Sequence, residues 1–248
     1  MIYEEHDTGL NPYIAVLSYP RSGSNFLYFA LYSIMGVRYD KQHAASSGYW
    51  DDMYEMDGKP CSLHKFPMIL IVRNPLECIP RQTGEYHFGP ETLAALSNSI
   101  PTGQDVSQHH YDYIKLIDHY DKATQPKIMV YYEDLLTNPG AEIKRVLDHL
   151  KGLRTDWKFK LRPTDPEALP FQVEDYDPLR YQYFMDNYEE LKQKSLSRYG
   201  TITSASETRG EDLLFHSKQM PPHEASAVKR YITETYPELA DKYLKRYL

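Results

Sequence analysis

Short apolar runs alternate along the chain with longer segments that repeat apolar residues at helical spacing. Three of the runs, at 13–17, 68–72 and 127–132, are rich in β-forming residues and do not alternate with polar ones. Strands of this kind are typical of a parallel sheet that is buried on both faces. The pattern therefore predicts an α/β fold with a mostly parallel central sheet flanked by helices.

Helices are predicted after the strands. Residues 25–35 carry apolar side chains almost all round and are followed by Gly36, a residue type that commonly ends a helix. We also expect helices at 105–122 and at 139–151, and the second of these opens with a proline at its first position.

The rest of the chain predicts connections and a helical tail. Residues 38–60 and 153–180 have no clear period and are expected to be irregular. The C-terminal part predicts two short helices broken at Pro237, and its charged last turns are expected to form a solvated face. No internal repeat divides the sequence, and its length fits one α/β domain over 1–248.

Composition narrows the classes of protein. The formal net charge of −7 argues against a general nucleic-acid binder, although a local basic pocket for an anion is compatible with it. The two cysteines, Cys61 and Cys78, are too few for a secreted disulfide framework. No stretch approaches the roughly 18 apolar residues of a membrane span, and the N-terminus lacks a basic signal region. We therefore expect a soluble, cytoplasmic protein without a membrane partner.

The loop between the first strand and the first helix suggests the chemistry. It reads Pro-Arg-Ser-Gly-Ser-Asn over 20–25. Backbone N–H groups at a helix N-terminus lack an internal partner and favour an anion, Gly23 allows a close approach, and Arg21 adds a planar cation. The loop predicts a phosphate or sulfate site, and a simple helix cap is the alternative. It is not a Walker loop, because it has neither the second glycine nor the Lys-Ser/Thr pair.

Three motifs together resemble one enzyme family. "YPRSGSNFL" resembles the 5′-phosphosulfate loop of sulfotransferases that use 3′-phosphoadenosine 5′-phosphosulfate (PAPS). "IVRNPLECIPR" resembles the 3′-phosphate motif of that family, and "VYYEDLLTNP" resembles its strand end at Tyr-Glu-Asp. The motifs occur in the family's order, each at the end of a predicted strand. The resemblance implies a sulfotransferase domain with a P-loop-like phosphosulfate-binding loop.

The resemblance implies roles around the sulfate-bearing end of the nucleotide. Arg21 stands where the family has a lysine that neutralises the bridging oxygen as sulfate leaves. Phe26 stands where the family has a tryptophan that stacks on adenine. The small polar residues between them would hold the 5′-phosphate: Ser22, Gly23, Ser24 and Asn25.

The resemblance also implies which residues bind the 3′-phosphate and the adenine of the nucleotide, and they come from three places in the chain. Arg73 would bind the 3′-phosphate, Tyr132 would lie near the adenine, and Arg209 with Gly210 would close over the phosphate from the other side. Arg81 stands where the family has a serine, eight positions after Arg73. It either binds the same phosphate as a stronger donor or points elsewhere.

A catalytic base is also required, because the acceptor must lose a proton. His64 in "CSLHKFP" resembles the histidine of the family's KTH element, and an imidazole titrates near neutral pH. Lys65 follows it and is the candidate for the cation that the family places two residues before its histidine. A purely structural role for His64 is the alternative. His87 is the reserve base and His43 a weaker one. Glu133 is expected to hold the loop beside Tyr132.

The sequence thus predicts a PAPS-dependent sulfotransferase that releases 3′-phosphoadenosine 5′-phosphate (PAP) and needs no metal. Its acceptor would be a hydroxyl or amine of a small molecule or glycan. His109, His110 and His119 lack metal-binding spacing and are expected on a solvated helix face. Two other functions remain open. A nucleotide kinase would need Mg²⁺ and the missing Lys-Ser/Thr loop, and an inactive nucleotide-binding relative would explain Arg81 and the altered KTH element.

Overall fold

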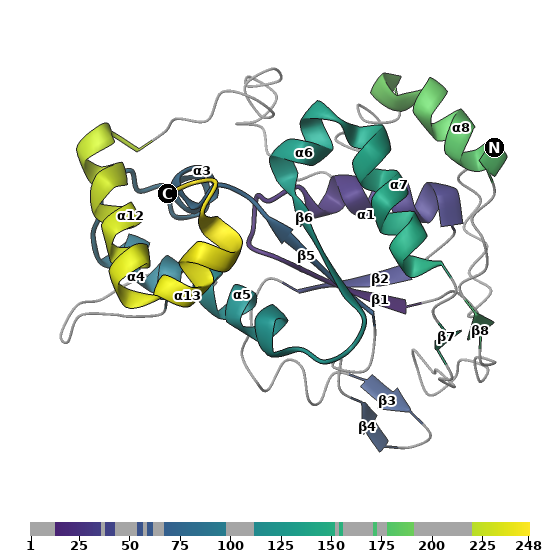
Figure 1. The fold of residues 1–248 in the computed structure, drawn as a ribbon, viewed down its shortest axis with the longest axis horizontal. Helices are drawn as coiled ribbons and strands as arrows, with labels where there is room; N and C mark the ends of the chain where they lie inside the picture. Colours follow the sequence, from purple (N-terminus) through teal and green to yellow (C-terminus); the bar gives the residue numbers. More distant parts are fainter. Residues whose placement is uncertain are drawn as a thin grey trace.

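The central sheet has four parallel strands. The computed structural model describes residues 13–35, 38–42, 54–56, 59–61, 67–97, 112–151, 154–155, 171–172, 178–190 and 220–248. The strands are β1 (Tyr13–Ser18), β2 (Arg38–Gln42), β5 (Met68–Val72) and β6 (Lys127–Tyr131), in the spatial order β2-β1-β5-β6 (Figure 1). The predicted α/β class with a mostly parallel sheet is therefore confirmed.

The order of the strands creates a switch point between β1 and β5. Both β2 and β5 pair in parallel with β1, so that Leu17 stands opposite Gln42 on one side and Leu70 on the other. After β1 the chain goes to one edge of the sheet and then returns to the other side of β1. Open α/β sheets bind ligands at such a point, beyond the carboxyl ends of the strands.

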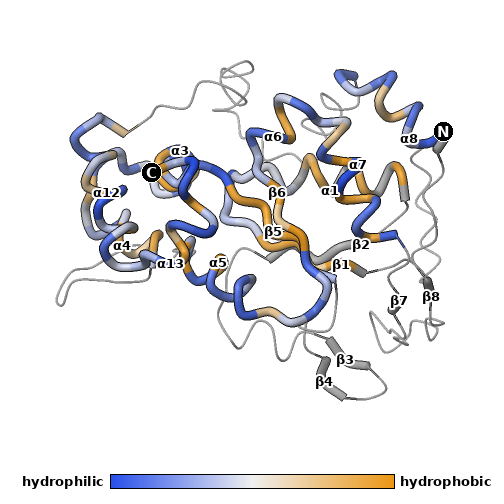
Figure 2. Tube along the Cα trace, viewed as in Figure 1, coloured by the Kyte–Doolittle hydropathy of each residue, from blue (hydrophilic) through white to orange (hydrophobic). Residues whose placement is uncertain are grey.

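Helices cover both faces of the sheet, because alternate residues of each strand point to opposite sides. Ala15 and Leu17 belong to the core under α3 (Pro75–Thr83), α4 (Pro90–Ser97), α5 (Tyr113–Lys122) and α12 (Pro222–Thr235). Ile14 and Val16 belong to the other core, under α1 (Ser24–Met35) and α7 (Pro139–Leu150). Figure 2 shows hydrophobic residues gathered in β5 and β6, between these layers.

Shorter elements complete the described chain. The helical ones are α6 (Tyr132–Thr137), α8 (Pro178–Asp186), α13 (Pro237–Leu239) and the π-helical segment η2 (Ala240–Leu244). Two small antiparallel pairs are β3 (Tyr54–Met56) with β4 (Lys59–Cys61), and β7 (Arg154–Thr155) with β8 (Phe171–Gln172). None of the described helices is both long and apolar enough to cross a membrane.

Most predicted elements are confirmed, with small shifts at their ends. The strand predicted at 127–132 ends one residue earlier, because Tyr132 already begins α6. The described part of the helix predicted at 105–122 is α5, and the break at Pro237 separates α12 from α13. The prediction that residues 38–60 are irregular was wrong where β2, β3 and β4 form. Likewise, β7, β8 and the start of α8 lie within 153–180.

Candidate functional site

The loop between β1 and α1 has the backbone of an anion site. The N–H of Ser22 donates to the carbonyl of Tyr19 at 3.2 Å, and the N–H groups of Phe26 and Leu27 donate to the carbonyl of Gly23 at 3.1 and 3.3 Å. The first N–H groups of α1 have no intrahelical acceptor, because no turn precedes them. Since the helix dipole also favours negative charge there, the loop presents donors to an anion at the switch point.

Two loop residues adopt left-handed backbone conformations. Arg21 has φ 68° and Gly23 has φ 84°. A Cβ on Gly23 would lie 2.5 Å from Cε2 of Tyr132, so the ring packs directly against the glycine. Only glycine fits here, both for its φ and for this contact. The side chain of Arg21 is exposed, and a left-handed non-glycine residue marks a place where the surrounding structure imposes the backbone.

Arg73 joins the three motifs. Its Nη1 donates to the carbonyl of Arg21 at 2.7 Å, and its Nη2 donates to Oε2 of Glu77 at 3.0 Å. Its Cζ lies 4.3 Å from the ring centroid of Tyr132, a cation–π contact. The side chain is only 4% exposed. The ends of β1, β5 and β6 therefore meet around one buried guanidinium.

Two buried polar atoms at this point have no partner among the described residues. They are Oγ of Ser22 and Nε of Arg73. Buried polar atoms are nearly always hydrogen-bonded, so an unpaired donor in a native site needs an explanation. An oxyanion seated in the loop would accept from the hydroxyl of Ser22, and a second phosphate beside the end of β5 would accept from the guanidinium of Arg73. The residues present therefore fit the phosphosulfate group that the sequence resemblance implies.

Arg81 brings a second cation near the first. It lies on α3, is partly buried, and stands four residues after Glu77 on the same helix. Burial, and next the charge of Arg73, lower the pKa of Arg81, while Tyr132 and Glu77 act in the opposite direction. The carboxylate of Glu77, which is bonded to Arg73, offsets part of the repulsion between the two guanidinium groups. Phosphate contact by Arg81 stays a prediction.

The asparagine and glutamate of the second and third motifs hold the backbone in place. Oδ1 of Asn74 accepts from the N–H of Leu76 at 3.0 Å and caps α3. The N–H of Asn74 donates to Oε1 of Glu133 at 3.1 Å, which confirms the expected structural role of Glu133. The hydroxyl of Tyr113 donates to the carbonyl of Arg73 at 2.7 Å. The turn after β5 is thus fixed from two sides.

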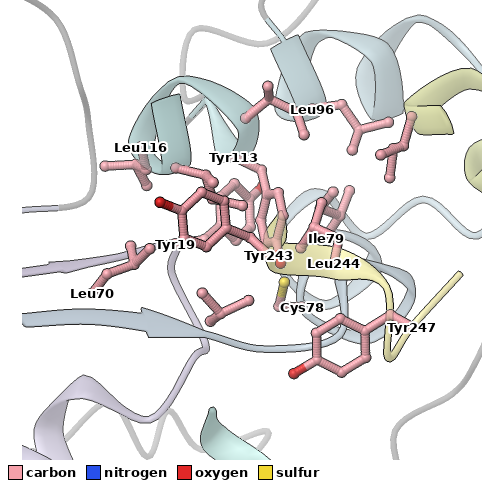
Figure 3. Packing of buried hydrophobic residues seen from close by; sticks show 14 of the residues in the cluster. Tyr19, Leu70, Cys78, Ile79, Leu96, Tyr113, Leu116, Tyr243, Leu244 and Tyr247 are labelled. Carbon is pink, nitrogen blue, oxygen red and sulfur yellow. The ribbon is translucent and has the colours of Figure 1, made fainter. Parts of the chain in front are cut away.

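A tyrosine-rich core includes Tyr19, the residue just before the loop proline (Figure 3). The rings of Tyr19 and Tyr113 meet edge to face, with centroids 5.5 Å apart. Cys78 lies in the same cluster, and burial raises the pKa of its thiol to about 12. The thiol therefore stays protonated at neutral pH and is not a nucleophile. The core therefore anchors the chain immediately before the loop.

Phe26 lies one turn beyond the loop and is partly buried. Its ring meets the ring of Tyr188 edge to face, with centroids 5.6 Å apart. Tyr188 follows α8, which packs alongside α1. Asn25 and Ser24 occupy the first turn of α1, and Ser24 is buried.

Several predicted site residues lie outside the described residues. These are His64, Lys65, Arg209, Gly210 and His43, together with His109 and His110. His87 is described and exposed, and its Nδ1 lies 3.1 Å from Oε2 of Glu85. His119 lies in the last turn of α5. Among the described ranges, no group of three or more His, Cys, Asp or Glu side chains is arranged to hold a metal ion.

Sequence reasoning missed two features of the site. One is the ion pair of Arg73 with Glu77, which the spacing of four residues could have indicated. The second feature is the set of contacts made by the tail: the exposed Arg246 pairs with Asp134, and the hydroxyl of the buried Tyr247 donates to Oε2 of Glu133. No local pattern in the sequence indicates the contacts of the tail.

Comparisons with known proteins add one finding. No protein-family model and no curated protein matches the chain. A crystal structure of the mouse sulfotransferase SULT7A1 complexed with PAP matches with a TM-score of 0.30 and 11% identity, covering 82% of this chain and 90% of that one. A TM-score of this size shows neither membership of a family nor an activity.

Proposed function

We propose that this chain transfers a sulfuryl group from PAPS to a hydroxyl or amine of a small-molecule or glycan acceptor. One observation carries the proposal: three motifs that are far apart in the sequence meet at the carboxyl ends of neighbouring strands. Arg73 bonds the carbonyl of Arg21 and stacks on Tyr132, while Tyr132 packs on Gly23. The sequence resemblance assigns these same residues to a single nucleotide.

The described residues supply the anion-binding part of this chemistry. When bound, PAPS supplies the sulfuryl group and a phosphate that can leave. The amides at the start of α1 and the hydroxyl of Ser22 would bind the 5′-phosphate. Arg21 would neutralise the charge that develops on the bridging oxygen as its bond to sulfur breaks. His64 would take the proton that the acceptor loses as it bonds to sulfur.

The loop chemistry favours this function over a nucleotide kinase. A phosphate-binding loop of the Walker type needs a lysine followed by a Ser or Thr that binds Mg²⁺. Residues 20–25 contain no lysine and so lack this pair. The cations that the structure brings together here are arginines, which bind phosphate and sulfate without a metal. Arg81 adds to this positive charge from α3.

Calorimetric titration of the full chain tests the proposal. PAP should bind at least about tenfold more tightly than AMP, because the 3′-phosphate adds charge-assisted hydrogen bonds to arginine. Release of PAP from PAPS in the presence of hydroxyl and amine acceptors then tests transfer. Tight binding of ATP with Mg²⁺ and none of PAP would favour the kinase. Binding of PAP without transfer to any acceptor would favour the inactive relative.

Ser22→Ala separates ligand binding from folding. The hydroxyl of Ser22 has no partner among the described residues, so its removal should leave the free energy of unfolding unchanged or slightly higher. The same change should weaken PAP binding about tenfold, because a hydrogen bond to a charged group is lost. Denaturant unfolding and calorimetry measure the two effects.

Ser97→Ala is the matched control. Oγ of Ser97 lies 2.8 Å from the hydroxyl of Tyr231, between α4 and α12. Its removal should lower the free energy of unfolding by about 1 kcal/mol and leave PAP binding within about twofold. If Ser22→Ala lowers stability as Ser97→Ala does and leaves PAP affinity unchanged, Ser22 does not bind the nucleotide.

A further inference from the structure

The C-terminal segment packs beside the turn that carries Arg73. Figure 1 shows the C-terminus next to α3, the helix that follows β5. Tyr247 belongs to the same core cluster as Tyr19, Cys78 and Ile79, and Figure 3 shows these side chains around α3. The last residues of the chain and the residue just before the anion loop therefore share one core.

Three of the four residues of the Tyr-Tyr-Glu-Asp motif contact this segment. The hydroxyl of Tyr131 donates to the carbonyl of Tyr243 at 3.0 Å. The guanidinium of Arg246 donates to both carboxylate oxygens of Asp134, at 2.8 and 2.9 Å, and its Cζ lies 4.4 Å from the ring centroid of Tyr131. The hydroxyl of Tyr247 donates to Oε2 of Glu133 at 2.5 Å.

The remaining residue of the motif, Tyr132, faces the anion loop. It packs on Gly23 and under Arg73, on the opposite side of the strand end from Tyr131. The C-terminal contacts and the loop contacts therefore act on adjacent residues of one backbone segment. A shift of Glu133 would be passed directly to Tyr132 and, through it, to Gly23.

Glu133 is also a shared acceptor. Its Oε1 accepts from the N–H of Asn74, and its Oε2 accepts from Tyr247. Tyr247 is 8% exposed, and burial raises the pKa of its hydroxyl, which therefore keeps its proton and remains a donor. Without this hydroxyl, the carboxylate loses the bond that orients it toward Asn74. Asn74 caps α3, the helix that carries Arg81.

We propose that Tyr247 is a positioning residue for the anion site, acting through Glu133 on the turn after β5 and on Tyr132. The proposal depends on the proposed function only for the identity of the nucleotide. The coupling of Tyr247 to the anion loop through Glu133 depends only on contacts between described residues, and hydrogen exchange tests it without the nucleotide.

Tyr247→Phe and Tyr243→Phe form a matched pair. Each variant removes one tyrosine hydroxyl of the C-terminal segment that donates to a carboxylate at 2.5 Å. The acceptor of Tyr243 is Asp121, at the end of α5, whose other hydrogen bonds among the described residues come from Lys127 and Lys242 and not from the loop. Tyr247→Phe should raise the Kd for PAP about fivefold, within the range for mutations along a coupled network, and Tyr243→Phe should change it less than about twofold. Both titrations are made well below the unfolding temperature.

Amide hydrogen exchange gives a readout that does not need the nucleotide. Tyr247→Phe should speed exchange in peptides covering 19–27 and 73–76, whereas Tyr243→Phe should leave them unchanged. Equal effects of the two variants, or no effect of either, on both PAP affinity and exchange would overturn the proposal. If the wild-type chain does not bind PAP, the proposed function fails. The exchange comparison alone then decides whether Tyr247 positions the loop.

Discussion

Gly23 shows how one residue links the backbone of the loop to the third motif. Its φ of 84° requires glycine, and the ring of Tyr132 occupies the space where a side chain would begin. Gly84 provides the comparison, because it has a similar φ of 79° but no atom within 4 Å of the position of a Cβ. The two positions therefore separate backbone strain from the packing on Tyr132.

Gly84→Ala should lower the free energy of unfolding by about 1 kcal/mol, the cost of a left-handed alanine. Gly23→Ala should cost more, because Tyr132 must also move, and it should abolish measurable PAP binding. Urea unfolding and calorimetric titration check the pair. Equal losses of stability, with PAP binding retained, would show that Tyr132 gives way without disturbing the loop.

His149 makes stability depend on pH far from the site. Burial, and next the charge of Arg145 one turn earlier on α7, lower the pKa of His149 below its usual value. At pH values between the pKa of His149 in the folded chain and its ordinary pKa, the unfolded chain binds a proton that the folded chain does not. The free energy of unfolding therefore falls as the pH drops below about 6.5. Nε2 of His149 is buried and has no hydrogen-bond partner among the described residues.

His149→Gln should therefore reduce the loss of stability between pH 7.5 and pH 5.5. Urea unfolding of the wild type and the variant at both pH values measures the difference. The variant removes only the contribution of this imidazole, so other titrating groups affect both proteins alike. Parallel losses in the two proteins would show that the protonation of His149 is not linked to folding.

At the scale of elements, buried strands were predictable and edge strands were not. β5 forms at 68–72 as predicted, because five consecutive apolar residues are buried on both faces of the sheet. β2 reads Arg-Tyr-Asp-Lys-Gln and pairs only with β1, so its polar edge gives no apolar pattern to find. α8 was not predicted either, and it presents an exposed Leu179 where a helix normally carries a polar side chain.

The candidate site also has a part that was predictable from the sequence, formed by local contacts, and a part that was not, formed by contacts between distant residues. The loop of Ser22 and Gly23 was predictable, because the strand, the turn residues and the helix are consecutive in the sequence. Contacts between distant residues were not: 52 positions separate Arg73 from the Arg21 carbonyl it binds, and 114 separate Tyr247 from Glu133. Hydrogen bonds of this kind depend on how the layers pack and leave no periodic signal in the sequence.

For the molecule as a whole, the loop connects the two cores of the sheet. Tyr19, just before the loop, belongs to the core under α5, and Leu27, just after it, belongs to the core under α1. A ligand held between these residues contacts a segment that both cores must keep in place. Binding should therefore stabilise both sides of the sheet together.

PAP at about 100 times its Kd should add about 2.7 kcal/mol to the free energy of unfolding, which corresponds to a rise in Tm of roughly 5–10 °C for a chain of this size. Differential scanning calorimetry should show a single transition that moves as a unit. AMP at the same concentration should raise Tm less, because it lacks the 3′-phosphate that Arg73 and Arg81 would bind. A split transition with only one part shifted would show that the two cores unfold separately and that the loop does not couple them.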